Sequence, residues 1–424
     1  MTDTAEKIQN AGDVDIKEVS IITANGFKQT ITPQVFGIEL YEDMFSQFIS
    51  GKVFVKDSQD LTNLLPLVGE ELLSIHVHTP SMDTTQDIQM EFMIYKYDDR
   101  FKVKEREVVY VLHFISKEAI VDLNKKVSRG FKGRIDEIVK QICEEELATK
   151  KELDLEQTKN STRFISNFWN PARCLQWVTD QAVNAIDSPS YLFYETTEGF
   201  HFRSLTSLYQ GTPIKQRFLW DSYTAIVDTN ASAGGSSSGS IDEDYRRVLE
   251  FDYQQNWNYM ERLKSGMYGS EIIYYDLLTQ QYVHKGYRPQ WDEKKTLNQY
   301  PLWSSKVIAK QRAVLMHDHQ YSNAFEDYDD VSNTKIRQER RSLLAQAEGY
   351  KVSINVYGRC DYHAGQRVYL EVPSSKQLPK DDPEYLDKLM SGNYLIGAIC
   401  HFINREKHEC NMELIKDSYM RELT

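Results

Sequence analysis

The chain has 424 residues, of which 41% are hydrophobic and 27% are charged, so it is long enough for two to four domains and has the balance of a folded globular protein. Its net charge of −13 argues against a protein that grips nucleic acid, because phosphate contacts need Lys and Arg. No apolar run approaches the roughly 18 residues that cross a membrane.

The N-terminal residues and the cysteines predict a protein that is made in the cytoplasm. Residues 1–15 are polar and lack the apolar segment of a secretion signal. The cysteines are odd in number and scattered, which predicts reduced thiols. They are Cys143, Cys174, Cys360, Cys400 and Cys410.

The first block of the sequence is rich in predicted strands. Residues 1–14 are expected to form a flexible arm. Alternation over 16–23 predicts a strand, and Asn25-Gly26 is a strong hairpin signal before a second strand at 27–31. Further strands are predicted at 35–41, 51–56, 70–78, 88–97 and 106–115, with a short helical insert at 59–65. Such a series of antiparallel strands is typical of a small barrel or sandwich.

The middle of the chain predicts a mixed α+β region over 117–205. Ser116 can cap a helix at 117–124, and apolar residues at helical spacing predict another at 134–147. Asn170-Pro171 predicts a helix start with Asn as N-cap, and this helix is expected to run to about residue 185. Strands at 191–194 and 200–203 are expected to pair around Glu198-Gly199.

A Gly/Ser stretch precedes the last part of the chain. Residues 231–240 (ASAGGSSSGS) are the one low-complexity segment and predict a mobile loop outside any core. The elements predicted beyond it are a strand at 247–253, a helix near 255–264, a hairpin at 267–276 and 280–287, an irregular region at 288–333, a helix at 335–347, and strands at 351–357, 366–372, 393–402 and 409–416.

No catalytic or cofactor motif is visible in the sequence. A Gly-rich phosphate loop, a Gly-x-Ser-x-Gly elbow and a His-Glu-x-x-His helix are all absent. Cys360, His363, His408 and Cys410 could together supply four zinc ligands. However, alternation puts Cys410 on the face of Met412 and Leu414, which is typical of a core thiol. We therefore predict no catalytic residue, no cofactor and no metal site, and we leave metal binding near 360 and 408 open.

Other polar clusters have simple surface explanations. His317-Asp318-His319 resembles a metal or acid–base triplet, but a polar loop or edge strand gives the same pattern by chance. Carboxylates cluster at 144–146, 326–330 and 381–382, where a glycosidase pair is possible but a solvated surface is expected. Basic residues cluster on or beside helices, where they form either a solvated face or a contact with an acidic partner. These are Lys125, Lys126, Arg129, Lys132, Arg134, Arg337, Arg340 and Arg341.

Several segments resemble the baseplate central hub proteins of contractile-tailed bacteriophages, a family related to the hub part of type VI secretion spike proteins. The first tube domain of that family is similar to Leu40-Tyr-Glu-Asp-Met-Phe45, Gly51-Lys-Val-Phe-Val-Lys-Asp-Ser58 and Leu64-Leu-Pro-Leu-Val-Gly-Glu-Glu71. Its middle domain is similar to 113–117, Asn170-Pro171, 191–203, Ser265-Gly-Met-Tyr-Gly-Ser270 and Ile272-Ile-Tyr-Tyr-Asp276. Its second tube domain is similar to Gly358, Gly365, Val368-x-Leu370-x-Val372-Pro373, Ser391-Gly-Asn-Tyr-Leu-Ile396 and His401.

The resemblance covers roughly residues 15–420 and implies a β-rich α+β fold with two tube-type antiparallel β-barrel domains. It divides the chain into a flexible arm (1–14), a first tube domain (15–116), an α+β middle domain (117–215), a strand with the Gly/Ser loop and an inserted α+β segment (216–334), and a second tube domain (335–424) completed by strands from 216–253. The sequence ends at Thr424, so the needle-like β-helix and lysozyme segment of spike-fused relatives are not expected.

The resemblance also implies a structural role without enzymatic activity. The chain is expected to form a homotrimeric ring that adapts a sixfold tail tube to a threefold spike. Its expected partners are further copies of itself, the central spike protein, the tail tube or tube-initiator protein, and the tape measure protein. It is expected in the virion baseplate after assembly in the host cytoplasm, without membrane insertion. DNA would pass through without specific binding, and the acidic residues are expected to line the channel and repel phosphate.

Two other functions stay open at this point. One is a related ring component, either a type VI secretion-like spike hub or a tail-tube initiator. The other is a virion cell-wall hydrolase, which would use a pair of the clustered carboxylates.

Overall fold

The computed structural model describes residues 8, 10–59, 67–82, 86–104, 107–214, 217–220, 241–253, 258–276, 280–304, 313–319, 333–376, 378–379 and 381–423. The predicted helical insert at 59–65 and the predicted Gly/Ser loop at 231–240 lie outside these residues, apart from residue 59. Within the described part of the chain, no helix has both the length and the apolar character needed to cross a membrane.

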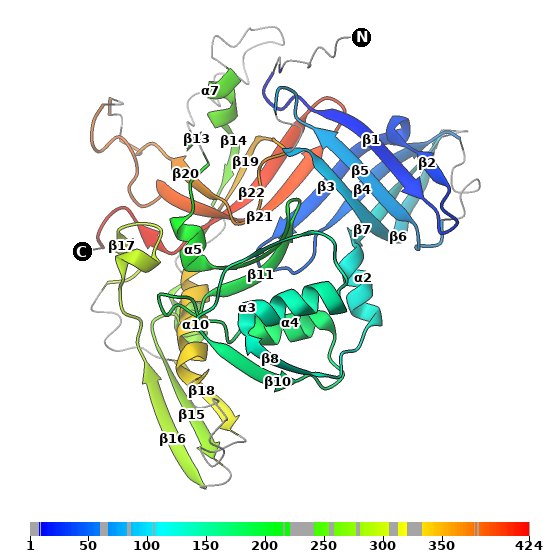
Figure 1. Ribbon diagram of the computed structural model, residues 1–424. Helices are drawn as coiled ribbons and strands as arrows, with labels where there is room; N and C mark the ends of the chain where they lie inside the picture. Colours follow the sequence, from blue (N-terminus) through cyan, green and yellow to red (C-terminus); the bar gives the residue numbers. More distant parts are fainter. Residues whose placement is uncertain are drawn as a thin grey trace.

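Strands from both ends of the chain form one large curled sheet of 13 strands, which is mostly antiparallel (Figure 1). Its order is β14-β19-β22-β21-β3-β4-β7-β6-β5-β1-β2, with β20 also paired to β21 and β13 to β20. The strands are β1 Asp15–Ile22, β2 Lys28–Thr30, β3 Val35–Asp43, β4 Ser50–Asp57, β5 Leu72–His78, β6 Ile88–Lys104, β7 Glu107–Ser116, β13 Arg217–Leu219, β14 Val248–Asp252, β19 Tyr350–Tyr357, β20 Arg367–Glu371, β21 Gly392–Ile403 and β22 His408–Lys416.

The two halves of this sheet meet where β3 pairs with β21. The register runs antiparallel from Ala398 opposite Asp43 to Ile403 opposite Ile38. At one end of the joint Ile403 is buried in the core of the N-terminal strands, and at the other end Met44 is buried in the core of the C-terminal strands. The halves are therefore fastened by both backbone hydrogen bonds and exchanged apolar side chains.

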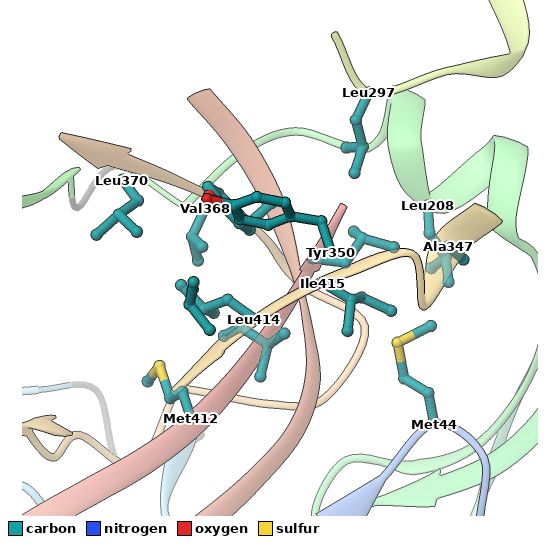
Figure 2. Packing of buried hydrophobic residues seen from close by; sticks show 14 of the residues in the cluster. Met44, Leu208, Leu297, Ala347, Tyr350, Val368, Leu370, Met412, Leu414 and Ile415 are labelled. Carbon is teal, nitrogen blue, oxygen red and sulfur yellow. The ribbon is translucent and has the colours of Figure 1, made fainter. Parts of the chain in front are cut away.

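Alternating apolar residues build the C-terminal core. Val352, Ile354 and Val356 of β19 are buried while the residues between them are partly exposed, as expected for a strand with one face on a core. Figure 2 shows Met44 packed in the same cluster as Ala347 and Ile415. The strand predictions for this block are confirmed, including the four at 351–357, 366–372, 393–402 and 409–416.

The middle of the chain forms a separate core between short helices and small sheets. The helices α3 Ile135–Gln141 and α4 Pro171–Thr179 pack with a π-helical turn at Ile142–Glu146 and with the hairpin β11–β12. The remaining strands of the region are β8 Gly130–Arg134, β9 Glu152–Leu155, β10 Ser161–Ile165, β11 Tyr191–Thr196 and β12 Gly199–Ser204, in sheets β10-β8 and β11-β12-β9. The other helices here are α2 Lys117–Asn124 and α5 Leu205–Gln210.

A third group of elements extends away from the large sheet at the bottom of Figure 1. The sheet β16-β15-β18 is built from β15 Ser270–Asp276, β16 Gln281–Tyr287 and β18 Ala313–His319, and it contacts α10 Asn333–Ala347. The predicted hairpin over 267–287 is confirmed, whereas β18 was not predicted. The other elements are α7 Ile241–Arg246, α8 Tyr259–Ser265, the 3-10 helices Thr32–Gln34 and Glu293–Lys295, and the pair β17 Tyr300–Pro301 and β23 Ser418–Tyr419.

The helix predicted from residue 171 to about residue 185 ends earlier, at Thr179. The reason lies in Asn184, whose side-chain oxygen accepts hydrogen bonds from the backbone N–H groups of Ile186 (3.1 Å) and Ser188 (2.9 Å). Such local side-chain bonds compete with helical ones. The predicted start is confirmed, with Asn170 as the N-cap residue and Pro171 as the first helical residue. The capping bond comes from elsewhere: the Asp122 side chain accepts from the N–H of Ala172 at 2.6 Å, while the Asn170 side chain donates to the backbone carbonyl of Asp122.

Gly51 occupies a position where β4 has no room for a side chain. A Cβ atom there would lie 2.3 Å from the carbonyl oxygen of Glu39 and 2.3 Å from the Phe114 ring. We expect Gly51→Ala to lower the free energy of unfolding by about 1–3 kcal/mol, as overpacked core substitutions do. Urea denaturation measures the change. Gly286→Ala, in a strand where a Cβ meets nothing within 4 Å, is the matched control and should be close to neutral.

Candidate metal centre and buried junctions

Two histidines and a cysteine converge inside the C-terminal half of the large sheet. His401 of β21 lies directly opposite Cys410 of β22, and His408 lies two residues before Cys410 on the same strand face. The Nδ1 of His401 is 3.0 Å from the Nε2 of His408, and the Cys410 Sγ is 3.3 Å and 3.5 Å from these two nitrogens. All three residues are fully buried.

The chain around the cluster is shaped to hold the His408 ring. A Cβ atom on Gly358 would lie 2.3 Å from that ring, so only glycine fits there. The Gly358 N–H donates to the carbonyl of His408, and the His408 N–H donates to the carbonyl of Gly12, both at 2.8 Å. The cluster thus lies where the β21–β22 hairpin, the segment after β19 and the start of the described chain meet.

Burial is the largest cause that favours the uncharged form of all three groups. It lowers the pKa of His401 to about 4 and that of His408 well below its ordinary value, and it raises the pKa of the Cys410 thiol well above its ordinary value. Imidazole nitrogen and thiolate sulfur are both ligand atoms that zinc uses in proteins.

The structure separates the four residues that spacing suggested as zinc ligands. His408 and Cys410 are together, but Cys360 packs in the core of the N-terminal strands, with its N–H donating to the Thr79 hydroxyl at 3.0 Å. His363 belongs to a different polar group. The residue that completes the cluster is His401, which spacing did not single out. Its signal was the register of the 393–402 and 409–416 hairpin, which sets His401 opposite Cys410.

The predicted solvated surface is wrong for Glu146, which is buried, while Glu144 and Glu145 beside it are exposed. Glu144, Glu145 and Glu146 are ion-paired to Lys140, Arg129 and Lys125, and Asp382 accepts a turn hydrogen bond from the Glu384 N–H. The acidic residues 326–330 lie outside the described residues. His317-Asp318-His319 ends β18, with only its backbone described.

The basic residues predicted near the helices mostly meet this chain's own groups. Lys125, Arg129 and Arg134 pair with carboxylates of the same segment. The prediction of a solvated face is wrong for Arg340, because this residue is only 7% exposed. Its side chain donates hydrogen bonds to Asp180 and to the carbonyls of Pro189 and Tyr191. Arg340 is therefore a clamp between α10 and the segment around β11.

A buried carboxylate, Glu42, joins three parts of the chain. Its two oxygens accept from the N–H of Thr197 at 2.8 Å and from the N–H of Ala364 at 2.9 Å, and the Nδ1 of His363 lies 3.7 Å away. Burial raises the pKa of Glu42, but His363, His401 and the backbone donor outweigh it and lower the pKa to about 2. Burial lowers the pKa of His363, but the neighbouring Glu42 raises it by more, so the net shift is upward.

A second buried junction fastens the N-terminal strands to the middle segment. The Lys151 ammonium donates to Glu118 at 2.7 Å, to Ser116 at 2.8 Å and also to Glu195. The other oxygen of Glu195 accepts from the N–H of Ile49 at 3.1 Å. The side chain of Glu195 is 0% exposed and that of Glu118 is 8% exposed, so this one cation serves two buried carboxylates.

The fold is shared along the whole chain with phage tail proteins. A tail protein from Neisseria meningitidis MC58 matches with a TM-score of 0.55 at 10% identity, covering 94% of this chain and 96% of that one. The 43 kDa tail protein of prophage MuSo2 from Shewanella oneidensis matches with a TM-score of 0.55 at 8% identity, covering 95% and 98%. A type VI secretion component of E. coli matches with a TM-score of 0.42 at 10% identity, covering 95% and 76%.

The sequence itself gives no such match. No protein-family model matches it, and no curated protein does. The similarity therefore lies in the fold. The chain has the same fold as these two phage tail proteins.

Proposed function

We propose that this chain is the central hub subunit of a contractile phage-tail baseplate, and that three copies close into a ring between the tail tube and the spike. The observation that carries the proposal is the large curled sheet, in which an N-terminal and a C-terminal set of strands are joined edge to edge through β3 and β21. Two such halves in each of three chains give six similar units around one axis, which suits an adaptor between sixfold and threefold partners.

The buried cores support a proposed division of the chain. The N-terminal strands surround one cluster of buried side chains and the middle segment has a second, while the C-terminal strands surround a third that also takes in Leu192, Tyr194 and Leu205 of the middle segment. We assign 15–116 and 335–424 to two tube-type barrel domains, with β13 and β14 completing the second, and 117–215 to the middle domain. The pairing of β13 with β20 and of β14 with β19 supports this assignment.

Exposed apolar side chains on the N-terminal strands support an assembling protein. Large apolar residues that stay exposed mark contact surfaces when they form a contiguous patch. Those on this part of the chain include Phe27 (58% exposed), Phe36 (45%), Tyr95 (49%), Phe101 (56%) and Val103 (50%). A closed cyclic ring uses heterologous contacts, in which such a surface meets a different surface of the next copy.

Native mass spectrometry of the purified chain with its spike protein tests the stoichiometry. We expect three copies of this chain on one spike, and electron microscopy should show a ring. A stable dimer, or an assembly with twofold symmetry, would contradict the proposal. The electrostatic potential of the inner wall of the ring is a second measurement. The net charge of −13 suits a channel whose wall repels DNA, and a neutral or basic wall would contradict a DNA-repelling channel.

The proposed role is structural and involves no catalysis. A peptidoglycan zymogram of the purified chain should show no clearing. Clearing that disappears on substitution of a carboxylate in this chain would support a cell-wall hydrolase instead.

A further inference from the structure

We propose that His401, His408 and Cys410 bind one Zn²⁺ ion per chain. Nothing in the proposed hub function requires a metal, and the inference rests on the geometry of these three side chains alone. The three donor atoms come from two adjacent strands and approach one another at 3.0, 3.3 and 3.5 Å in a fully buried site.

These separations are close to those that zinc imposes on its ligands. With Zn–N distances of about 2.0–2.1 Å and a Zn–S distance of about 2.3 Å, tetrahedral angles place two nitrogens roughly 3.3 Å apart and a nitrogen and a sulfur roughly 3.5 Å apart. The cluster therefore needs to open by only a few tenths of an ångström. Three protein ligands leave one tetrahedral position for a water molecule or another oxygen.

The apolar residues around the cluster favour a bound metal ion between the three side chains. Met412 and Leu414 continue the face of β22 that carries His408 and Cys410, and all of them are fully buried. Polar groups buried among apolar neighbours lose their hydration, and mutual hydrogen bonds restore only part of it. Zinc would replace these weak contacts by coordination bonds, as it does in structural sites that stabilise folds.

Binding needs the release of one proton. The Cys410 thiol loses its proton to solvent as the sulfur–zinc bond forms, while both imidazoles coordinate through their lone pairs and keep the proton on the other ring nitrogen. The donors are Sγ of Cys410, Nδ1 of His401 and Nε2 of His408, the atoms that approach one another in the cluster. No oxidant or reductant takes part.

The bound ion would fasten several segments at once. The β21–β22 hairpin supplies the ligands, while Gly358 and Gly12 hold the His408 backbone. We therefore expect zinc removal to loosen the C-terminal half of the sheet before the rest of the chain.

The test measures metal in the full-length chain, expressed with zinc in the medium and purified without a polyhistidine tag or chelator. Mass spectrometric metal analysis should find about one zinc per chain. Cys410→Ser and His408→Gln should retain less than a tenth of it. Cys360→Ser and His363→Gln, which alter the residues that the structure keeps out of the cluster, should retain all of it.

A measurement on the unaltered chain keeps the test decisive if a variant fails to fold. A strong chelator should lower its melting temperature and added zinc should restore it. Reconstitution with Co²⁺ should give the thiolate-to-cobalt charge-transfer absorption that a Cys ligand produces. A folded chain that holds no zinc after exposure to it, with a melting temperature that neither chelator nor zinc changes, would overturn the proposal. So would equal zinc content in Cys410→Ser. Neither result depends on whether the chain forms a ring.

Discussion

Replacing Lys151 with Met is expected to lower the free energy of unfolding by about 3–5 kcal/mol, the usual cost of removing one partner from a buried ionic group. The Lys151 ammonium is the shared partner of Glu195 and Glu118, and it also donates to Ser116. Burial raises the pKa of Glu195, which shows how poorly this site tolerates an uncompensated carboxylate. Methionine keeps the length of the side chain but leaves both carboxylates without their cation.

Urea denaturation of the two chains, followed by near-ultraviolet circular dichroism, measures this change. Lys159→Met is the matched control, because Lys159 pairs with Asp187 at 2.6 Å with side chains 54% and 69% exposed. Exposed pairs contribute about 0–1 kcal/mol. Equal losses in the two variants would show that burial of the Lys151 group does not matter. The triple variant with Gln at 118 and 195 should recover part of the stability, since it removes the stranded charges.

Strand content was predictable because alternation is a local signal. The Asn25-Gly26 hairpin and the strands of the C-terminal block come directly from period-2 patterns and turn residues, and the structure confirms them. Strands β8, β9 and β10 were missed because they are short and their faces are only weakly apolar; β10, for example, has no buried residue. Their positions depend on packing against α3 and α4, which no short window of sequence contains.

The pairing of β3 with β21 was beyond sequence reasoning for a different reason. Both strands were predicted, but each has buried residues along most of its length and either could have formed the edge of a separate barrel. Only the three-dimensional arrangement shows that Ile38 and Ile403 lie opposite each other. Separation along the chain, rather than any ambiguity in the strands, hid this contact.

The cluster of His401, His408 and Cys410 was half visible in the sequence. Cys410 lies on the strand predicted at 409–416 and His408 lies just before it; the observed strand β22 begins at His408, so the two residues share a face. Cys360 and His363 lie in an irregular segment after β19, where spacing gives no direction to a side chain, and the structure sends them to different neighbours. His401 follows from the hairpin register, which needs the positions of both strands and of the turn between them.

Glu42→Gln is expected to lower the free energy of unfolding by about 3 kcal/mol, and the size of this loss should depend on pH. The Glu42 pKa of about 2, against an ordinary value of 4.5, corresponds to roughly 3 kcal/mol at about 1.4 kcal/mol per pKa unit. Because this pKa is lowered in the folded chain, its contribution is present above pH 4.5 and disappears as the pH falls toward 2. Because the pKa of His363 is raised, its contribution is present below pH 6.5 and disappears as the pH rises through the folded value.

The lowered pKa of Glu42 and the raised pKa of His363 together predict that the free energies of unfolding of the Glu42→Gln and unaltered chains differ most at pH 4.5–6.5. Urea denaturation at pH 3, 5.5 and 9 should therefore show a maximum at pH 5.5. Glu384→Gln is the control, since Glu384 and its partner Lys376 are 64% and 67% exposed and the pair contributes little. A loss in Glu42→Gln that is the same at all three pH values would mean that shape, and not the charge of Glu42 against His363, holds this junction.

The pH dependence of this junction matters for assembly because Glu42 bonds to Thr197 of the middle segment and to Ala364 of the C-terminal block, while its own strand carries the joint with β21. A chain that loses this carboxylate therefore loses one contact that joins the N-terminal strands to both the middle segment and the C-terminal block.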